Sequence, residues 1–201
     1  MFSHIIAFLA MMNPFAMFLY LGPVMEELDN KDFLKVLMKA SLISLIVFVA
    51  FIFSGDFIFT KVLQIDFNSF RIFGGVIVFS LAYLFIVKGH KALIIMQGDL
   101  DDLAEEIALP YMVGAGTISM TILMTKDVGT ADSLISVLLI LAVNLLIIIS
   151  LKKIRDLLSK KKLKIAFDKN MGILLRLNGF FLGAIGVHMI VAGIRSLFEI
   201  V

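Results

Sequence analysis

Two short motifs in this chain combine polar or small residues with proline inside long apolar stretches. Asn13-Pro14 interrupts the first stretch, and Gly114-Ala115-Gly116-Thr117 follows Pro110 in the fourth. Asn is favoured at a helix N-cap and Pro at the first helical position, so a second helix is predicted to begin at Pro14. A helix that begins inside a membrane offers free N–H groups and a positive dipole end, which suit a carboxylate.

The second motif is predicted to do the same from the other half of the chain. Its small residues permit positive φ and close backbone approach, and Thr117 and Ser119 add hydroxyl groups. Each motif also has a purely structural interpretation, namely a proline kink with an interhelical hydrogen bond, or tight glycine packing. The predicted binding residues are Asn13, Pro14, Gly114, Ala115, Gly116, Thr117 and Ser119.

Four further polar residues lie in the apolar stretches and are predicted to be structural or to act in gating: Arg71, Arg176, Asn178 and His188. The two arginines each precede a glycine by three residues, and snorkelling to the interface is their alternative role. His188 and Asn144 are predicted to be buried, where an interhelical hydrogen bond is the simpler explanation and a functional role the other.

These residues must be positioned by transmembrane helices. The 201 residues are 61% hydrophobic with a mean hydropathy of +1.05, and 17% are charged. An apolar run of roughly 20 residues crosses a bilayer as a helix. We therefore predict an all-α protein, in which helices 1 and 4 are interrupted near the midplane, with six spans at 5–25, 40–60, 67–88, 107–125, 133–151 and 172–195.

The distribution of lysine predicts the orientation. Most Lys residues lie between spans 5 and 6 or flank spans 2 and 3, which places these segments in the cytoplasm and both termini outside. The cluster around Lys160–Lys164 is expected to contact anionic lipid head groups, and nothing points to nucleic acid. The chain has no cysteine, which excludes disulfides and thiolate chemistry.

The single transmembrane domain, 1–201, is predicted to consist of two repeats, 1–92 and 105–201. Arg71 and Gly74 match Arg176 and Gly179 at an offset of 105, and the two proline motifs occupy comparable places. Because three spans are an odd number, the second repeat would enter the membrane from the opposite side. Such inverted repeats are common in secondary transporters.

Several segments together resemble the MarC family of small prokaryotic inner-membrane proteins. They are Asn13-Pro14, Phe70-Arg-Ile-Phe-Gly-Gly75, Ala108-Leu-Pro-Tyr-Met-Val-Gly-Ala-Gly-Thr-Ile118 and the stretch 183–193. The family includes small-neutral-amino-acid transporters of the SnatA type, so the resemblance implies glycine, alanine or serine as substrates. The chain departs from the family at Ala16, Met17 and Leu19 and at Ala115, which bears on the substrate more than on the fold.

We therefore expect a secondary transporter of small neutral amino acids, with an ion or small-solute channel as the alternative. No nucleotide, dinucleotide or zinc-protease motif is present, so an enzyme is not expected and no cofactor is required. The coupling ion stays open: sodium could bind freed carbonyl groups, whereas a proton relay would need His188 or Asp56. The oligomeric state and the direction of transport also stay open.

Overall fold

The computed structural model describes residues 2–89, 104 and 112–198. Within them every regular element is a helix. The elements are α1 (Phe2–Met12), α2 (Pro14–Tyr20), α3 (Gly22–Glu27), α4 (Asn30–Phe57), the π-helical segment η1 (Ile58–Val62), α5 (Phe67–Lys88), α7 (Ala115–Val128), α8 (Thr130–Leu157) and α9 (Lys161–Leu197).

Among the described residues, five helical segments are long and apolar enough to cross a membrane. They are Phe2–Tyr20, Asn30–Gly55, Phe67–Lys88, Thr130–Leu157 and Lys161–Leu197. The predicted fourth span is represented by α7, whose 14 residues extend roughly 21 Å, less than the hydrocarbon core of about 30 Å. Pro110 and the rest of 107–111 lie outside the described residues, so the fourth span, its interruption near the midplane and the total of six spans stay predictions.

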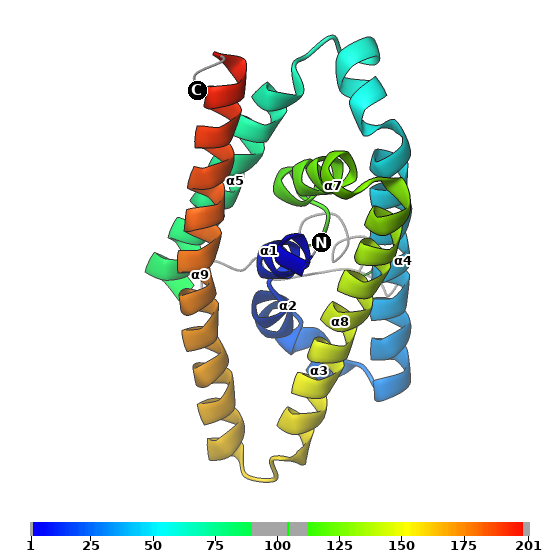
Figure 1. Cartoon of the computed structure of the whole chain (residues 1–201). Coiled ribbons are helices and arrows are strands. Elements are labelled where there is room, and N and C mark those ends of the chain that lie inside the picture. The colour runs from blue at the N-terminus through cyan, green and yellow to red at the C-terminus, as the bar shows by residue number, and fades with distance from the viewer. Residues whose placement is uncertain (1, 90–103, 105–111, 199–201) are drawn as a thin grey trace.

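Short helices occupy the centre of the molecule (Figure 1). Helices α1, α2 and α7 lie between two long helix pairs, α4 with α8 and α5 with α9. The large apolar residues Phe53, Leu146 and Phe181 of the long helices are exposed, as expected for faces that contact lipid. These short helices are therefore shielded by the long ones.

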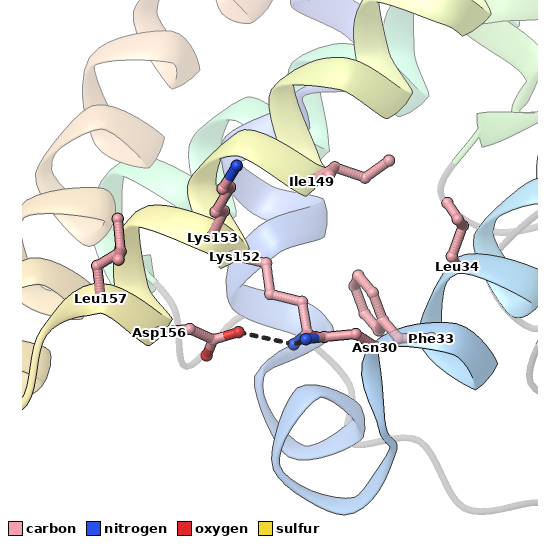
Figure 2. Close-up of a pocket in the computed structure, with 8 residues that line it drawn as sticks. All are labelled: Asn30, Phe33, Leu34, Ile149, Lys152, Lys153, Asp156 and Leu157. Carbon is pink, nitrogen blue, oxygen red and sulfur yellow. Dashed lines mark hydrogen bonds and ion pairs between the residues drawn. The ribbon is translucent and has the colours of Figure 1, made fainter.

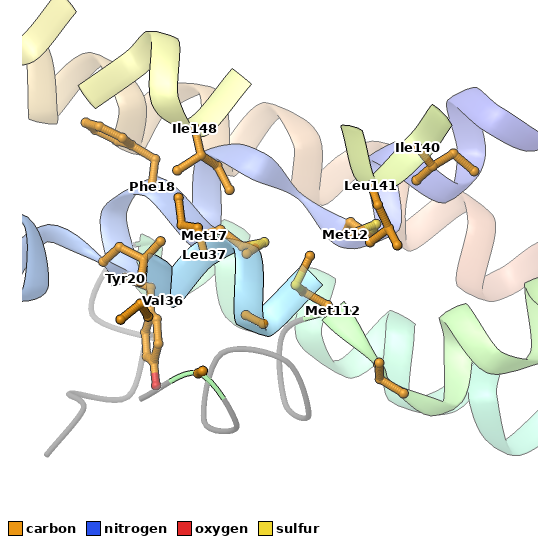
Figure 3. Packing of buried hydrophobic residues seen from close by; sticks show 14 of the residues in the cluster. Met12, Met17, Phe18, Tyr20, Val36, Leu37, Met112, Ile140, Leu141 and Ile148 are labelled. Carbon is orange, nitrogen blue, oxygen red and sulfur yellow. The ribbon is translucent and has the colours of Figure 1, made fainter. Parts of the chain in front are cut away.

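The main apolar cluster joins the broken helix to α4 and α8 (Figure 3). The rings of Phe8 and Phe48 pack edge-on with centroids 5.2 Å apart. Flexible methionines fill much of the remaining space beside the break, among them Met12, Met17 and Met112.

Helices α4 and α8 bury their side chains in the same register. Each buried side chain of α4 from Phe33 to Ile52 has a buried counterpart 100 positions later in α8. The two helices run in opposite directions: the start of α4 and the end of α8 lie at the same end of the molecule (Figure 1).

Helices α5 and α9 pack closely through glycine. A Cβ atom added to Gly75 would lie 2.7 Å from the carbonyl oxygen of Gly186, and one added to Gly186 would lie 2.8 Å from that of Gly75. Farther along, a Cβ on Gly179 would lie 3.2 Å from the carbonyl oxygen of Ala82. Small residues thus allow these two backbones to touch, as in many membrane helix pairs.

The structure corrects two sequence-based boundaries. The lysine-rich segment between spans 5 and 6 is helical except for the turn at 158–160, because Lys and Leu are good helix formers and α8 and α9 continue beyond the apolar region. Helix α4 begins ten residues earlier than the predicted 40, where the Asp29 carboxylate accepts a 2.8 Å hydrogen bond from the Asp32 N–H. Both errors came from equating helix ends with the ends of apolar runs.

Candidate functional site

The predicted helix start at Pro14 is present. Asn13 adopts a left-handed conformation with φ 48° and ψ 74°, and its Oδ1 accepts a 3.1 Å hydrogen bond from the Ala16 N–H. Asn is one of the few residues that tolerate this conformation. Asn13 is buried, and its Nδ2 has no hydrogen-bond partner among the described residues. The break therefore leaves an unused donor in the protein interior.

Asn178 stabilises the other side of the same break. In a continuous helix the carbonyl of Ala10 would accept from the residue at position 14, but proline has no N–H. The Nδ2 of Asn178 on α9 donates a 3.0 Å hydrogen bond to the Ala10 oxygen instead. Asn178 thus contacts the break directly, and its structural or gating role stays a prediction.

Helix α7 begins differently from the expectation. Gly114 is extended at φ −115° and ψ 170°, so the prediction of positive φ is wrong for it, and Gly116 lies inside the helix. The Gly114 N–H donates to the Thr117 hydroxyl at 2.9 Å, and that hydroxyl lies 3.0 Å from the Met112 and Gly114 carbonyl oxygens. Thr117 therefore caps the helix with the group that was expected to face a solute.

The two glycines of this motif have different surroundings. A Cβ added to Gly116 would lie 2.3 Å from Val78 Cγ2 and 2.7 Å from Met11 Cε, whereas one added to Gly114 would meet no atom within 4 Å. Gly116 thus serves close packing, the structural alternative, while Gly114 borders open space. The N–H groups of Ala115, Gly116 and Thr117 have no acceptor among the described residues, so the start of α7 has free donors.

Four buried side-chain atoms near these breaks lack hydrogen-bond partners within the described part of the chain. They are Asn13 Nδ2, Ser119 Oγ, Ser136 Oγ and Asn144 Oδ1. They belong to the broken helix, α7 and α8, which pack against one another. Unpaired buried polar groups are costly, so such a group in a native structure calls for an explanation.

Ser136 was not among the residues predicted from the sequence, and Asn144 was predicted to have either a structural or a functional role. The sequence did contain a signal for these residues, because polar side chains recur along one buried face of α8, which is otherwise strongly apolar. They are Ser133, Ser136, Asn144 and Lys152.

The remaining predicted residues lie apart from the breaks. Arg71 is partly buried with an unpartnered Nε, and Arg176 is exposed on α9 beside Gly89. His188 is exposed, because Gly186 and Met189 occupy the buried face of α9. The expected burial of His188 is therefore wrong. The side chain of Asp56 lies outside the described residues.

Two cavities lie at the end of the molecule that holds the lysine-rich 158–160 turn. One, of about 440 Å³, lies between α4 and α8 (Figure 2) and contains the largely buried Lys152, whose Nζ is 2.8 Å from Asp156 Oδ2, contacts Asn30 Oδ1 and lies over the Phe33 ring. The other, of about 710 Å³, is bordered by Leu19 of α2 and by residues of α9 that include Arg176.

An ion-pair cluster joins three helices at this same end. Arg155 of α8 donates from Nε to Asp168 of α9 at 3.0 Å and from Nη2 to Glu26 of α3 at 2.8 Å. The Arg155 side chain is 12% exposed. Hydrogen bonds to both carboxylates make this contact stronger than an ordinary surface pair. At the other end of the short helices, His4 Nε2 of α1 lies 2.9 Å from Asp127 Oδ2 of α7.

Comparison with known proteins identifies the family. The family described as MarC family integral membrane protein matches residues 1–198. A UPF0056 membrane protein of Pyrococcus horikoshii is 25% identical over 193 residues, covering 95% of this chain and 91% of the relative. One from Methanocaldococcus jannaschii is 27% identical over 198 residues, covering 93% and 92%. No solved structure gives a significant match.

Proposed function

Because this chain belongs to the MarC family of integral membrane proteins, we propose that it is a secondary transporter of small neutral amino acids. Glycine, alanine and serine are the proposed substrates, and alternating access is the proposed mechanism. The observation that carries the proposal is the set of unpartnered polar atoms around a helix break in a membrane-embedded core. A polar solute would satisfy these atoms, and a passive anchor would have no need of them.

The internal packing supports the inverted repeat in this proposal. Burial recurs at an offset of 100 between the antiparallel helices α4 and α8. Between α5 and α9 two contacts are related by an offset of 104 residues. Gly75 lies 104 positions before Gly179, and Ala82 lies 104 positions before Gly186. The contact of Gly75 with Gly186 therefore corresponds to the contact of Gly179 with Ala82. This register is one residue from the 105 deduced from Arg71 and Arg176. Reciprocal contacts of this kind are what a two-fold relation between two halves would produce.

In the proposed mechanism the carboxylate of the amino acid binds the free N–H groups at the start of α7. Gly114 borders open space there, and Asn13 Nδ2 offers a further donor. The backbone groups act as fixed dipoles, which bind an anion without introducing a charge into the membrane. A small solute space would exclude larger side chains by steric clash.

The proposed orientation places the 158–160 turn and the start of α4 in the cytoplasm, with both termini outside. The lysine residues gathered at this end support it, because cytoplasmic segments carry the excess of positive charge. The chain would reside in the prokaryotic inner membrane.

Counterflow in proteoliposomes tests the function. Vesicles preloaded with unlabelled alanine should accumulate labelled glycine, alanine or serine to saturation, and sodium and pH gradients imposed separately would identify the coupling ion. Labelled leucine and arginine serve as negative controls. Absence of counterflow with every small amino acid, or single-channel currents across a planar bilayer, would overturn the proposal in favour of another function or a channel.

A further inference from the structure

We infer that Asn144 is a substrate-binding residue, which accepts a hydrogen bond at Oδ1 from the ammonium group of the amino acid. The inference rests on the proposed function and adds a recognition element from α8. The start of α7 and Asn13 provide donors, which suit the carboxylate. A zwitterion also needs an acceptor for its ammonium group.

The environment of Asn144 supports this role. The residue is 0% exposed in the middle of α8, and its Nδ2 lies 3.5 Å from the Met17 sulfur. A thioether sulfur can only accept, so the amide nitrogen faces Met17 and Oδ1 faces elsewhere. Oδ1 has no donor among the described residues. The stronger acceptor of the side chain is therefore unused, while its nitrogen makes a weak contact.

Asn144 and Asn13 lie close to the same turn of the broken helix. The Met17 N–H donates to the Asn13 carbonyl at 3.1 Å, so these two residues are one turn apart, and the Met17 side chain reaches Asn144. One buried donor, Asn13 Nδ2, and one buried acceptor, Asn144 Oδ1, are thus both unpaired in this region. This pair matches the two charged ends of an α-amino acid.

The residue of α4 that lies 100 positions before Asn144 is also buried, but its polar group has a partner. A side chain that only packs at this position therefore does not need to leave an oxygen unpaired. Position 44 is a serine, whose hydroxyl lies 2.9 Å from the Ala40 carbonyl of its own helix and 3.3 Å from the Met112 sulfur. Ser44 is therefore satisfied within α4. Asn144 has no such partner in α8, although both residues are fully buried beside a methionine.

Met17 occupies the space next to Asn144 in this structure. Its side chain is 1% exposed and belongs to the packed methionine cluster shown in Figure 3. An unbranched thioether changes rotamer easily, so it can fill the core when no solute is bound and move aside when one enters. The weak amide–sulfur contact would be the one that is lost.

Binding of three related ligands to purified protein in nanodiscs tests the inference. Alanine has both charged groups, alaninamide lacks the carboxylate, and propionate lacks the ammonium group. Asn144→Leu removes the acceptor at nearly constant size and should weaken alanine binding about tenfold or more, while propionate binding stays unchanged. Asn144→Asp keeps an acceptor and adds charge, so it should shift preference toward the cation alaninamide. Ser44→Ala is the matched control and should bind alanine like the wild type.

The outcomes separate this inference from the proposed function. A folded Asn144→Leu protein that binds alanine like the wild type would overturn the role of Asn144 and leave transport intact. Equal losses in Asn144→Leu and Asn144→Asp, with no change in ligand preference, would show that the residue acts only in packing. If Asn144→Leu does not fold, the ligand preference of Asn144→Asp decides. Failure of the wild type to show counterflow with any amino acid would overturn both proposals.

Discussion

The side chain of Asn178 on α9 replaces the hydrogen bond that Pro14 cannot donate to the carbonyl of Ala10. One residue of the second half of the chain thus completes a helix end in the first half, although 168 positions separate Asn178 from Ala10. The proline break and the long C-terminal helix therefore depend on each other.

Removing this hydrogen bond should destabilise the protein. Asn178→Leu leaves the Ala10 carbonyl without a donor in an apolar region, which should cost about 1–3 kcal/mol. Thermal unfolding in detergent measures the loss as a lower Tm. Asn170→Leu, at an exposed position of the same helix, is the matched control and should leave the Tm almost unchanged. Equal Tm values for the two variants would show that the bond contributes nothing to stability.

The two glycines at the start of α7 should respond differently to substitution. Gly116→Leu places its side chain against Val78 and Met11 and should prevent correct packing, with severe loss of folded protein. Gly114→Leu meets no neighbour at its Cβ and should fold, yet it should reduce amino-acid binding at least tenfold by filling the adjacent space. Size-exclusion profiles report folding, and equilibrium binding of alanine reports the site. Normal binding by folded Gly114→Leu would refute the proposed carboxylate position.

A single methyl group between α5 and α9 should be enough to lower stability. Gly186→Ala would place a Cβ 2.8 Å from backbone atoms of Gly75 and Phe79, which cannot move as a flexible side chain could. We expect a loss of roughly 1–3 kcal/mol from overpacking. Gly172→Ala, on the same helix with no atom within 4 Å, is the control and should be neutral or slightly stabilising. An unchanged Tm for Gly186→Ala would contradict the close approach of the two backbones.

Cysteine labelling can test the proposed orientation without removing native thiols, because the chain has no cysteine. Lys161→Cys, at the start of α9, should be protected from an impermeant reagent applied to intact cells. Ser3→Cys should be labelled, since Ser3 is exposed in α1 and proposed to lie outside. Permeabilised cells should label both. The reverse pattern in intact cells would invert the orientation.

Much of the helical architecture could be predicted from the sequence. Apolar runs located the long helices, and Asn13-Pro14 identified a helix start, because capping and proline preferences are local. Helix ends were harder to predict, since lysine-rich segments stay helical beyond the apolar region. The exposure of His188 and the partner of Asn178 depend on how α9 packs against α5 and α1, which no local pattern encodes. Gly114 was assigned the wrong conformation because glycine permits positive φ without requiring it.

The glycine contact between α5 and α9 has a mechanical consequence. Two backbones already in contact cannot slide past each other without separating, so these helices should move as one rigid body. Helix α8 is linked to α9 by the 158–160 turn and by the bond from Arg155 to Asp168. From there α8 and α9 diverge toward the opposite end (Figure 1). A small rotation of α8 relative to α9 about this turn would therefore displace the far end of α8, where α7 connects to it, much more than the end near Arg155.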